Sequence, residues 1–171
     1  MTTMISAVKR AQSSYPVDLE GLCRELGIRV HSAWLADDVS GELVPVSEGR
    51  YQINVNATHG ERRRRFTIAH ELGHFFHHRH LIGTGIDDDR AYRSTSAGRY
   101  HNTSIGPREE TEANRFAANL LMPYDLISRL RAEGKTTPKA MADALQVSLP
   151  AMRIRLGLEP YPTAAEEFGP G

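Results

Sequence analysis

Residues 65–74, Arg-Phe-Thr-Ile-Ala-His-Glu-Leu-Gly-His, are the most informative stretch of the chain. They contain the pattern His-Glu-x-x-His, in which His70 and His74 are four positions apart. Residues at that spacing share one face of an α-helix, so both imidazoles can reach one metal ion. Glu71 lies beside that face, where its carboxylate can accept a proton from a water activated by the ion. The pattern therefore predicts a metal-dependent hydrolytic site on one long helix over residues 61–78.

A third protein ligand must come from outside this helix, because a catalytic zinc site has three protein ligands and one open position. Glu110 and Asn114 are four apart on a second predicted helix, so Glu110 can bind the ion while Asn114 hydrogen-bonds an imidazole. The neighbouring stripe of that helix carries small residues that would let the two helices approach closely, Ala113 and Ala117. His80 is the alternative ligand, but a helix continued past His74 would point it away from the metal-binding face.

The composition excludes several classes of protein. The 171 residues are 40% hydrophobic and 25% charged, which is typical of one globular domain with or without a small appendage, not of a collagen, a coiled-coil rod or a disordered chain. Lys+Arg and Asp+Glu are both 21, so bulk positive charge does not drive nucleic-acid binding. The single cysteine, Cys23, excludes a disulfide framework or a thiolate zinc finger within the chain. Because there is no apolar run of about 20 residues and no signal segment, we expect a cytoplasmic protein without membrane contacts.

The remaining pattern predicts further helices and short strands. Leucines at helical spacing predict a helix over residues 17–27. β-Branched or alternating stretches predict a small antiparallel sheet with strands over residues 28–34, 41–46 and 51–55. A stretch rich in Gly, Ser, Thr and Asp predicts a long loop over residues 83–106. More helices are expected over residues 107–122, 123–131 and, as a pair joined at Val147 and Ser148, 137–157.

Two stretches give the chain a specific family resemblance. Residues 65–74, followed by Glu110-x-x-Ala113-Asn114-x-Phe116-Ala117 and Leu121-Met122-Pro123, resemble the ImmA/IrrE family of His-Glu-x-x-His metallopeptidases. The resemblance covers about residues 16–158. It implies an α+β, zincin-like fold with a small sheet, an active-site helix and a third-ligand helix. It also implies that His70, His74 and Glu110 bind zinc, as in a gluzincin, and that Glu71 is the catalytic base.

The same resemblance implies a function in gene control. The family includes bacterial and phage proteases that cleave helix-turn-helix repressors. The expected activity is therefore that of a zinc-dependent endopeptidase whose partner is a helix-turn-helix (XRE-type) repressor, and whose cleavage derepresses stress, mobile-element or prophage genes. The alternatives are a non-catalytic, metal-containing transcriptional regulator and a component of a toxin–antitoxin pair. Two histidines and one carboxylate also suit Mn²⁺ or Fe²⁺, which we rank below Zn²⁺.

The oxyanion of a peptide-hydrolysis transition state needs a further hydrogen-bond donor. His78, Tyr92, Tyr100 and His101 are candidates for that role or for substrate contacts, and all four remain open. His78 continues the stripe of His74, and for it a structural hydrogen bond is the favoured interpretation.

We expect the chain to form two units and a tail. Residues 1–134 would form the metallopeptidase domain, residues 135–158 a helix-turn-helix-like lobe packed on it, and residues 159–171 a flexible tail. The core of the lobe would consist of Ala142, Leu145, Val147, Met152 and Leu156. Leu149 and Pro150 begin its second helix and are poor readers of base edges, so packing on the domain or docking of the repressor is favoured over direct DNA binding.

Three weaker features complete the sequence pattern. The arginine run at residues 62–65 stands at a helix start, where positive charge is unfavourable. It is either a solvated face, a site for an acidic substrate segment or a source of salt bridges to residues 87–89. Cys23 is predicted to be a core residue, and Trp34 is predicted to anchor packing between strand and helix.

Overall fold

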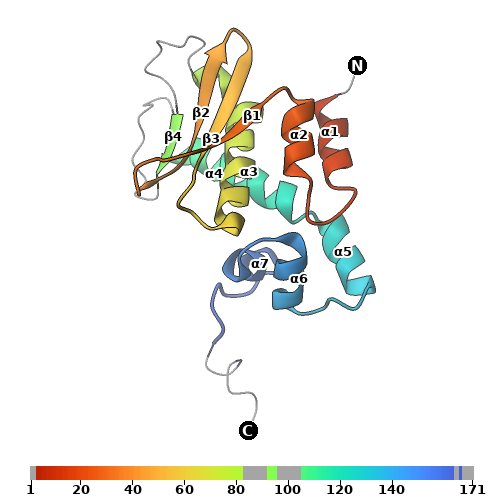
Figure 1. The fold of residues 1–171 in the computed structure, drawn as a ribbon. Helices are drawn as coiled ribbons and strands as arrows, with labels where there is room; N and C mark the ends of the chain where they lie inside the picture. The colour runs from red at the N-terminus through yellow and green to blue at the C-terminus, as the bar shows by residue number, and fades with distance from the viewer. Residues whose placement is uncertain (1–2, 83–91, 96–104, 164–165, 167–171) are drawn as a thin grey trace.

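The structure is a computed structural model, which describes residues 3–82, 92–95, 105–163 and 166. It has an α+β fold in which helices cover one face of a small sheet and a further group of helices lies beyond the N-terminal end of α3 (Figure 1). The strands are β1 (Arg29–Ala33), β2 (Val39–Ser47), β3 (Arg50–Asn56) and β4 (Tyr92–Thr95). The helices are α1 (Met4–Ala11), α2 (Leu19–Glu25), α3 (Glu61–His77), the 3₁₀ turn η1 (Arg79–Leu81), α4 (Pro107–Leu121), α5 (Tyr124–Ala132), α6 (Pro138–Leu145) and α7 (Leu149–Arg155).

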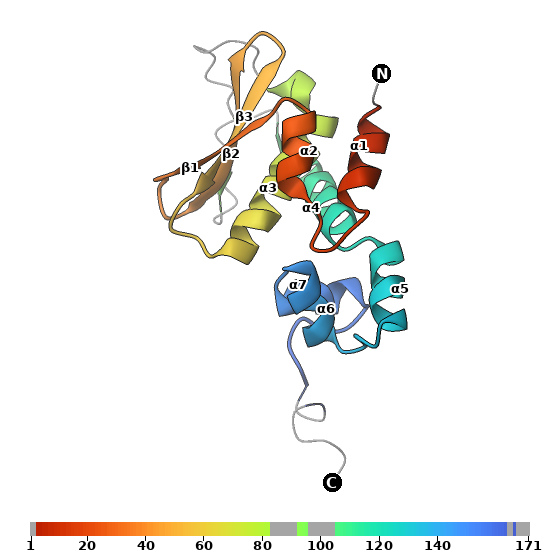
Figure 2. The same cartoon turned by 45° about the vertical axis from the view of Figure 1, so that its right-hand side comes forward.

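The sheet is mixed, with the strand order β1-β3-β2-β4. β2 and β3 form an antiparallel hairpin in which Leu43 lies opposite Ile53, whereas β1 runs parallel to β3 (Figure 2). The expectation of an antiparallel sheet is therefore wrong for β1. β1 and β2 do run in opposite directions, but β3 lies between them and so meets β1 in parallel orientation.

β4 corrects the expectation of a continuous loop over residues 83–106. Residues 92–95 pair antiparallel with β2, with Tyr92 opposite Leu43, and so occupy one edge of the sheet. This pairing supplies hydrogen-bond partners to a backbone edge that β3 does not cover. The other predicted loop residues are outside the described part of the chain, except for the last two, Ile105 and Gly106.

The core lies between the sheet and α3. Burial alternates along β2, so Leu43 faces inward, and Leu43 and Ile53 are fully buried together with Leu72 of α3. Gly41 of β2 faces α3 at a point where a side chain does not fit, because a Cβ there would lie 2.4 Å from Cγ2 of Thr67. Each buried large apolar side chain contributes about 1.5–3 kcal/mol to folding. The sheet therefore provides a firm support for the buried face of α3.

The helices agree closely with the expected ranges, with one exception at the N-terminus. α1 was not expected, because its buried residues, Ala7 and Ala11, are small and give little apolar pattern.

Cys23 is a core residue as predicted, and burial raises the pKa of its thiol to about 12. The prediction for Trp34 is wrong, since 86% of its surface is exposed directly after the end of β1. None of the described helices combines the length and apolar character needed to cross a membrane.

α6 and α7 form a compact pair, joined through Gln146 in the left-handed conformation (φ 54°). Of the expected lobe core, Leu156 is only partly buried, and the others are buried: Ala142, Leu145, Val147 and Met152. Arg62, at the start of α3, ties this pair to the main body by donating to the carbonyl of Val147 (3.0 Å) and to Asp143 (2.8 Å). At least one member of the arginine run thus has a structural contact, whereas residues 87–89 are outside the described part of the chain.

Candidate metal centre

α3 buries polar side chains on the face that meets α4. His70, Glu71 and His74 are 4%, 0% and 0% exposed. Gly73 explains how the two helices come so close, because a Cβ at this position would lie 2.9 Å from the Cα of Ala113 and 3.1 Å from its carbonyl oxygen. Ala113 and the next small residue of the stripe, Ala117, are fully buried. The expected close approach of the two helices is therefore present.

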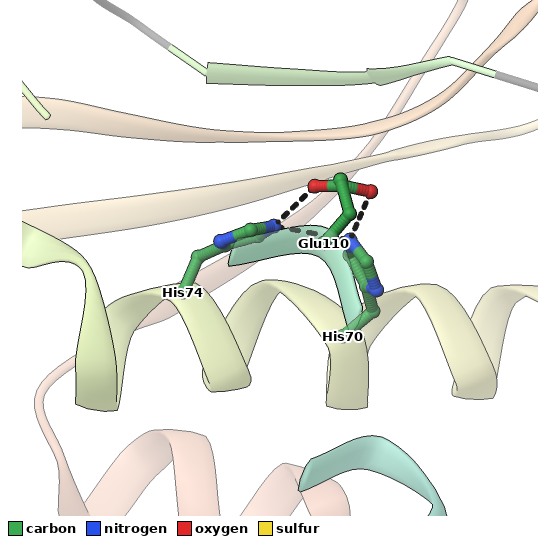
Figure 3. Close-up of side chains that lie close together, drawn as sticks. All are labelled: His70, His74 and Glu110. Atoms are coloured by element: carbon green, nitrogen blue, oxygen red, sulfur yellow. Dashed lines mark hydrogen bonds and ion pairs between the residues drawn. The ribbon is translucent and has the colours of Figure 1, made fainter. Parts of the chain in front are cut away.

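The tips of three side chains converge between α3 and α4 (Figure 3). Nε2 of His74 lies 3.1 Å from Nε2 of His70 and 2.8 Å from Oε1 of Glu110, and Nε2 of His70 lies 3.4 Å from Oε2 of Glu110. One ligand atom from each residue lies within 4.8 Å of the other two. Because Zn–N and Zn–O bonds are about 2.0–2.2 Å long, two atoms that share a tetrahedral zinc ion are about 3.4 Å apart. The cluster therefore has a composition and spacing that suit a three-ligand metal site.

The outer nitrogen of His70 has its own partner on α4. Nδ1 of His70 lies 2.8 Å from Oδ1 of Asn114, one turn after Glu110. If Nδ1–H donates to this amide oxygen, Nε2 keeps its lone pair and faces the cluster, which is the form that binds a metal. His80, the alternative ligand, is exposed in η1 and does not join the cluster of described residues.

Glu71 is the unusual group of the site. It is fully buried, and neither carboxylate oxygen has a hydrogen-bond partner among the described residues. Burial raises its pKa to about 8, while the nearby His70 lowers it and the carboxylates of Glu110 and Glu42 raise it further. A buried carboxylate without partners is costly unless something else occupies the site. The orphaned oxygens fit a water molecule, and the adjacent donor set fits a metal ion that would hold it.

The surroundings shift the pKa values of the two imidazoles in opposite directions. Burial lowers the pKa of His74 to about 4, and the nearby His70 and His78 lower it as well, against a hydrogen bond to Glu110. Burial also lowers the pKa of His70, but its hydrogen bond to Glu110 and the charges of Glu71 and Glu110 outweigh burial, so its pKa is raised. His74 is therefore kept neutral, as a metal ligand must be.

The comparison with known families now settles the kinship of the chain. Residues 23–157 match Peptidase_M78, described as the IrrE N-terminal-like domain. The chain belongs to this family. The match confirms the family resemblance of the sequence and supports a peptidase type of chemistry at the His70, His74 and Glu110 cluster.

One structurally similar protein is distant from the chain in sequence. A solved structure described as a Mycobacterium tuberculosis transcriptional regulator shares the fold, with a TM-score of 0.59 at 21% sequence identity. The match covers 91% of this chain and 46% of that one, so this chain spans about half the length of the regulator. No curated protein matches the chain.

The remaining candidate residues of this Peptidase_M78 chain are only partly placed. His78 is buried, and it lies against Nδ1 of His74 (2.9 Å) and not among the three ligand atoms. Tyr92 begins β4, and Tyr100 and His101 are outside the described part of the chain. Sequence reasoning missed Glu112, whose Oε2 lies 2.9 Å from Nε2 of His78. Glu112 follows directly after the acidic first turn of α4, and acidic residues near a helix start are too common to single it out.

Proposed function

We propose that the chain is a zinc-dependent endopeptidase of the zincin type with a gluzincin-like third ligand. His70, His74 and Glu110 would hold one zinc ion, and Glu71 would be the catalytic base. The observation that carries the proposal is the pair of unsatisfied, buried Glu71 oxygens next to three convergent ligand atoms. Two imidazoles and one carboxylate suit zinc, and Mn²⁺ or Fe²⁺ less well in a buried, three-ligand arrangement.

The protein groups have distinct roles in this chemistry. When bound, zinc would supply Lewis acidity toward water and toward the scissile peptide carbonyl. Glu71 would accept the proton of the attacking water and return it to the leaving amine nitrogen, for which a pKa raised toward neutrality is well suited. Asn114 would hold the ring of His70 by its 2.8 Å contact. An oxyanion donor among Tyr92, Tyr100 and His101 stays a prediction.

The substrate we propose is a helix-turn-helix repressor. Two findings support a role in gene control: the resemblance to repressor-cleaving peptidases and the description of the structurally similar protein as a transcriptional regulator. In this proposal, residues 1–134 form the peptidase domain, and residues 135–158 form a helix-turn-helix-like lobe that docks the repressor and does not read DNA. The lobe is fixed near the start of α3 by Arg62, so docking there would deliver the substrate beside the active-site helix.

The experiment compares the wild-type chain with Glu71→Gln in cells, by labelling new protein N-termini and identifying them by mass spectrometry. We expect new N-termini in a helix-turn-helix protein with the wild type, and none with Glu71→Gln at equal zinc content. Cleavage that persists in Glu71→Gln would contradict the role of Glu71. New N-termini confined to other classes of protein would overturn the repressor as substrate but leave the peptidase.

The second candidate is a non-catalytic regulator or a toxin–antitoxin component that keeps the metal for structure. The description of the structurally similar protein also suits this reading. The same pair of chains separates the two functions. A regulator would control its target genes equally well with Glu71→Gln, whereas a peptidase would lose control of them.

A further inference from the structure

A chain of side-chain contacts leads from His74 to the surface of the molecule. Nδ1 of His74 lies 2.9 Å from Nδ1 of His78, and Nε2 of His78 lies 2.9 Å from Oε2 of Glu112. Oε1 of Glu112 in turn accepts from Nε of Arg108 at 3.0 Å. The exposed fractions of these four side chains rise in order, 0%, 4%, 40% and 85%. The series thus connects a fully buried imidazole to solvent-exposed charges.

The contact between two imidazoles restricts where their protons can be. If Nε2 of His74 binds an ion, its proton is on Nδ1, and this N–H points at Nδ1 of His78. Nδ1 of His78 must then accept, so the proton of neutral His78 is on Nε2, where it donates to the carboxylate of Glu112. Each donor in the series meets one acceptor, and the carboxylate at its end is held by an arginine.

We propose that His78 is a positioning residue that, together with Glu112, holds His74 in the orientation and tautomer that bind the metal. The inference rests on the metal site of the proposed function and adds the residues that set one of its ligands. His78 is not an oxyanion donor in this arrangement, because one of its nitrogens contacts His74 and the other contacts Glu112.

The same helix supplies both the third ligand and the end of this contact series. Glu110, Glu112 and Asn114 stand at alternate positions of α4. Glu110 contacts both His70 and His74, and Asn114 contacts His70. Glu112 contacts His78, the residue that caps the C-terminus of α3. α4 thus fixes the outer nitrogen of each imidazole ligand, directly through Asn114 for His70 and through His78 for His74. A metal-binding histidine normally donates its second N–H to a carboxylate or carbonyl. Here the imidazole of His78 lies between His74 and the carboxylate of Glu112, and it accepts the second N–H of His74 in place of a carboxylate or carbonyl.

The test measures zinc affinity by competition with a chelator, in the full chain, for His78→Leu and His78→Gln. Leucine fills the buried position without hydrogen bonds, and we expect it to weaken zinc binding about 10- to 100-fold. Glutamine carries an amide oxygen that can accept from His74 and an N–H that can donate to Glu112, so it should restore most of the affinity. Glu112→Ala should fall between the two, because it removes only the outer contact.

A spectroscopic reading separates positioning from loss of folded structure. The visible spectrum of the Co²⁺-loaded protein reports the geometry of the ligands, and it should change in His78→Leu but stay close to wild type in His78→Gln. Thr111→Ala is the matched control on α4, because this exposed residue contacts only the carbonyl of Pro107 among the described residues. Wild-type affinity and spectrum in His78→Leu would overturn the role of His78 alone. Failure of the wild-type chain to bind zinc or cobalt would overturn both this inference and the proposed function.

Discussion

The α3–α4 contact and the α6–α7 pair both bury side chains between two helices, but the buried side chains are of different kinds. In the α6–α7 pair the fully buried residues are mainly apolar, such as Met141, Leu145 and Met152. At the α3–α4 contact, the equally buried positions include two histidines and Glu71. Burial of apolar surface stabilises the first contact directly, whereas burial of polar groups in the second has a cost that hydrogen bonds must offset.

The two regions also differ in how far hydrogen bonds offset the cost of burying polar groups. The buried Arg153 of α7 donates to the carbonyl of Glu159 at 2.7 Å and to the carboxylate of Glu166 at 2.8 Å. Glu71 has no such partner among the described residues, although it is more deeply buried. Proteins violate local rules mainly at functional sites. The difference indicates that α6–α7 is arranged for stability, and α3–α4 for a ligand that completes it.

The largest effect is expected from Glu110→Ala, which removes the carboxylate that faces both imidazoles. Zinc affinity should fall more than about 100-fold, because losing a residue that merely supports a ligand already lowers it about 10- to 100-fold. His70→Ala should behave in the same way. The measurement is metal content after dialysis against a weak chelator, together with peptidase activity.

Glu109→Ala is the matched control for Glu110→Ala. Glu109 stands one residue earlier, is partly exposed, and accepts from the backbone N–H of Gly106 at 2.9 Å. Its loss should weaken the start of α4 but leave zinc bound. If Glu110→Ala retained zinc as well as Glu109→Ala does, the third ligand would have to be sought elsewhere, and His80 would be the next candidate.

A second large effect is expected on the pH dependence of stability in the metal-free protein. Burial raises the pKa of Glu71 from 4.5 to about 8, so the folded chain favours the protonated form. Below pH 4.5 Glu71 is protonated in both the folded and the unfolded chain and has no effect on the pH dependence of stability. Between pH 4.5 and about 8 it ionises in the unfolded chain but stays protonated in the folded chain, so the folded chain loses stability as pH rises. Glu71→Gln removes this loss, so the variant should gain stability relative to wild type by several kcal/mol as pH rises.

Denaturant unfolding at pH 5 and pH 8 in the presence of a chelator measures this difference. The pKa shift of His74 affects both proteins, so the comparison largely removes it, whereas the shift of His70 depends in part on the charge of Glu71 and belongs to the measured difference. Glu133→Gln is a control that should leave the difference between pH 5 and pH 8 unchanged, because the hydrogen bond from Tyr15 lowers the pKa of Glu133 and its effect on stability therefore changes only below about pH 4.5. Equal pH dependence in Glu71→Gln and wild type would mean that the carboxylate finds partners in solution that it lacks here.

In the α6–α7 pair, by contrast, Leu145→Ala should affect stability alone. Leu145 is fully buried, so its truncation should destabilise the fold by about 2–5 kcal/mol through lost burial and a cavity. Ile154→Ala in α7 is the matched control, since Ile154 is 61% exposed and its loss should change stability by less than about 0.5 kcal/mol. At a temperature where both variants are folded, zinc content should be unchanged. Loss of zinc in Leu145→Ala would show that the two regions are not independent.

Much of the site could be predicted because its spacing reflects the helical repeat. The four-residue intervals of His70 and His74 and of Glu110 and Asn114 place each pair on one helix face, and the structure brings the three predicted ligand atoms together. Glu112 could not be found in this way. Its contact with His78 depends on the side-by-side placement of α3 and α4, which no local spacing encodes.

The sheet was less predictable for a related reason. Alternation located the strands of the β2–β3 hairpin, but strand order depends on contacts between distant residues, and so the parallel placement of β1 was missed. Trp34 was predicted to anchor packing between strand and helix, yet it directly follows the edge strand β1 and lies in solvent. β4 was missed because its four residues pair with β2 without an apolar pattern of their own.

The smallest effect is expected from Gly73→Ala, where two opposing contributions compete. In the middle of a helix, alanine is favoured over glycine by about 1 kcal/mol, so the substitution would stabilise an isolated α3. Here the added Cβ would lie 2.9 Å from the Cα of Ala113, and a backbone atom cannot rotate away as a side chain can. Overpacking of this kind costs about 1–3 kcal/mol, so the net change should be a modest destabilisation.

The sign of that change tests why glycine stands inside the His-Glu-x-x-His helix. If α4 must move outward to admit the methyl group, Glu110 moves with it, and zinc affinity should fall together with the melting temperature. Ala113→Gly should not rescue the variant, because the clash is with the backbone of residue 113 and not with its methyl group. A Gly73→Ala protein that melts at a higher temperature and binds zinc normally would show that the two helices can separate without loss, and that their closeness is not what brings the third ligand to the histidines.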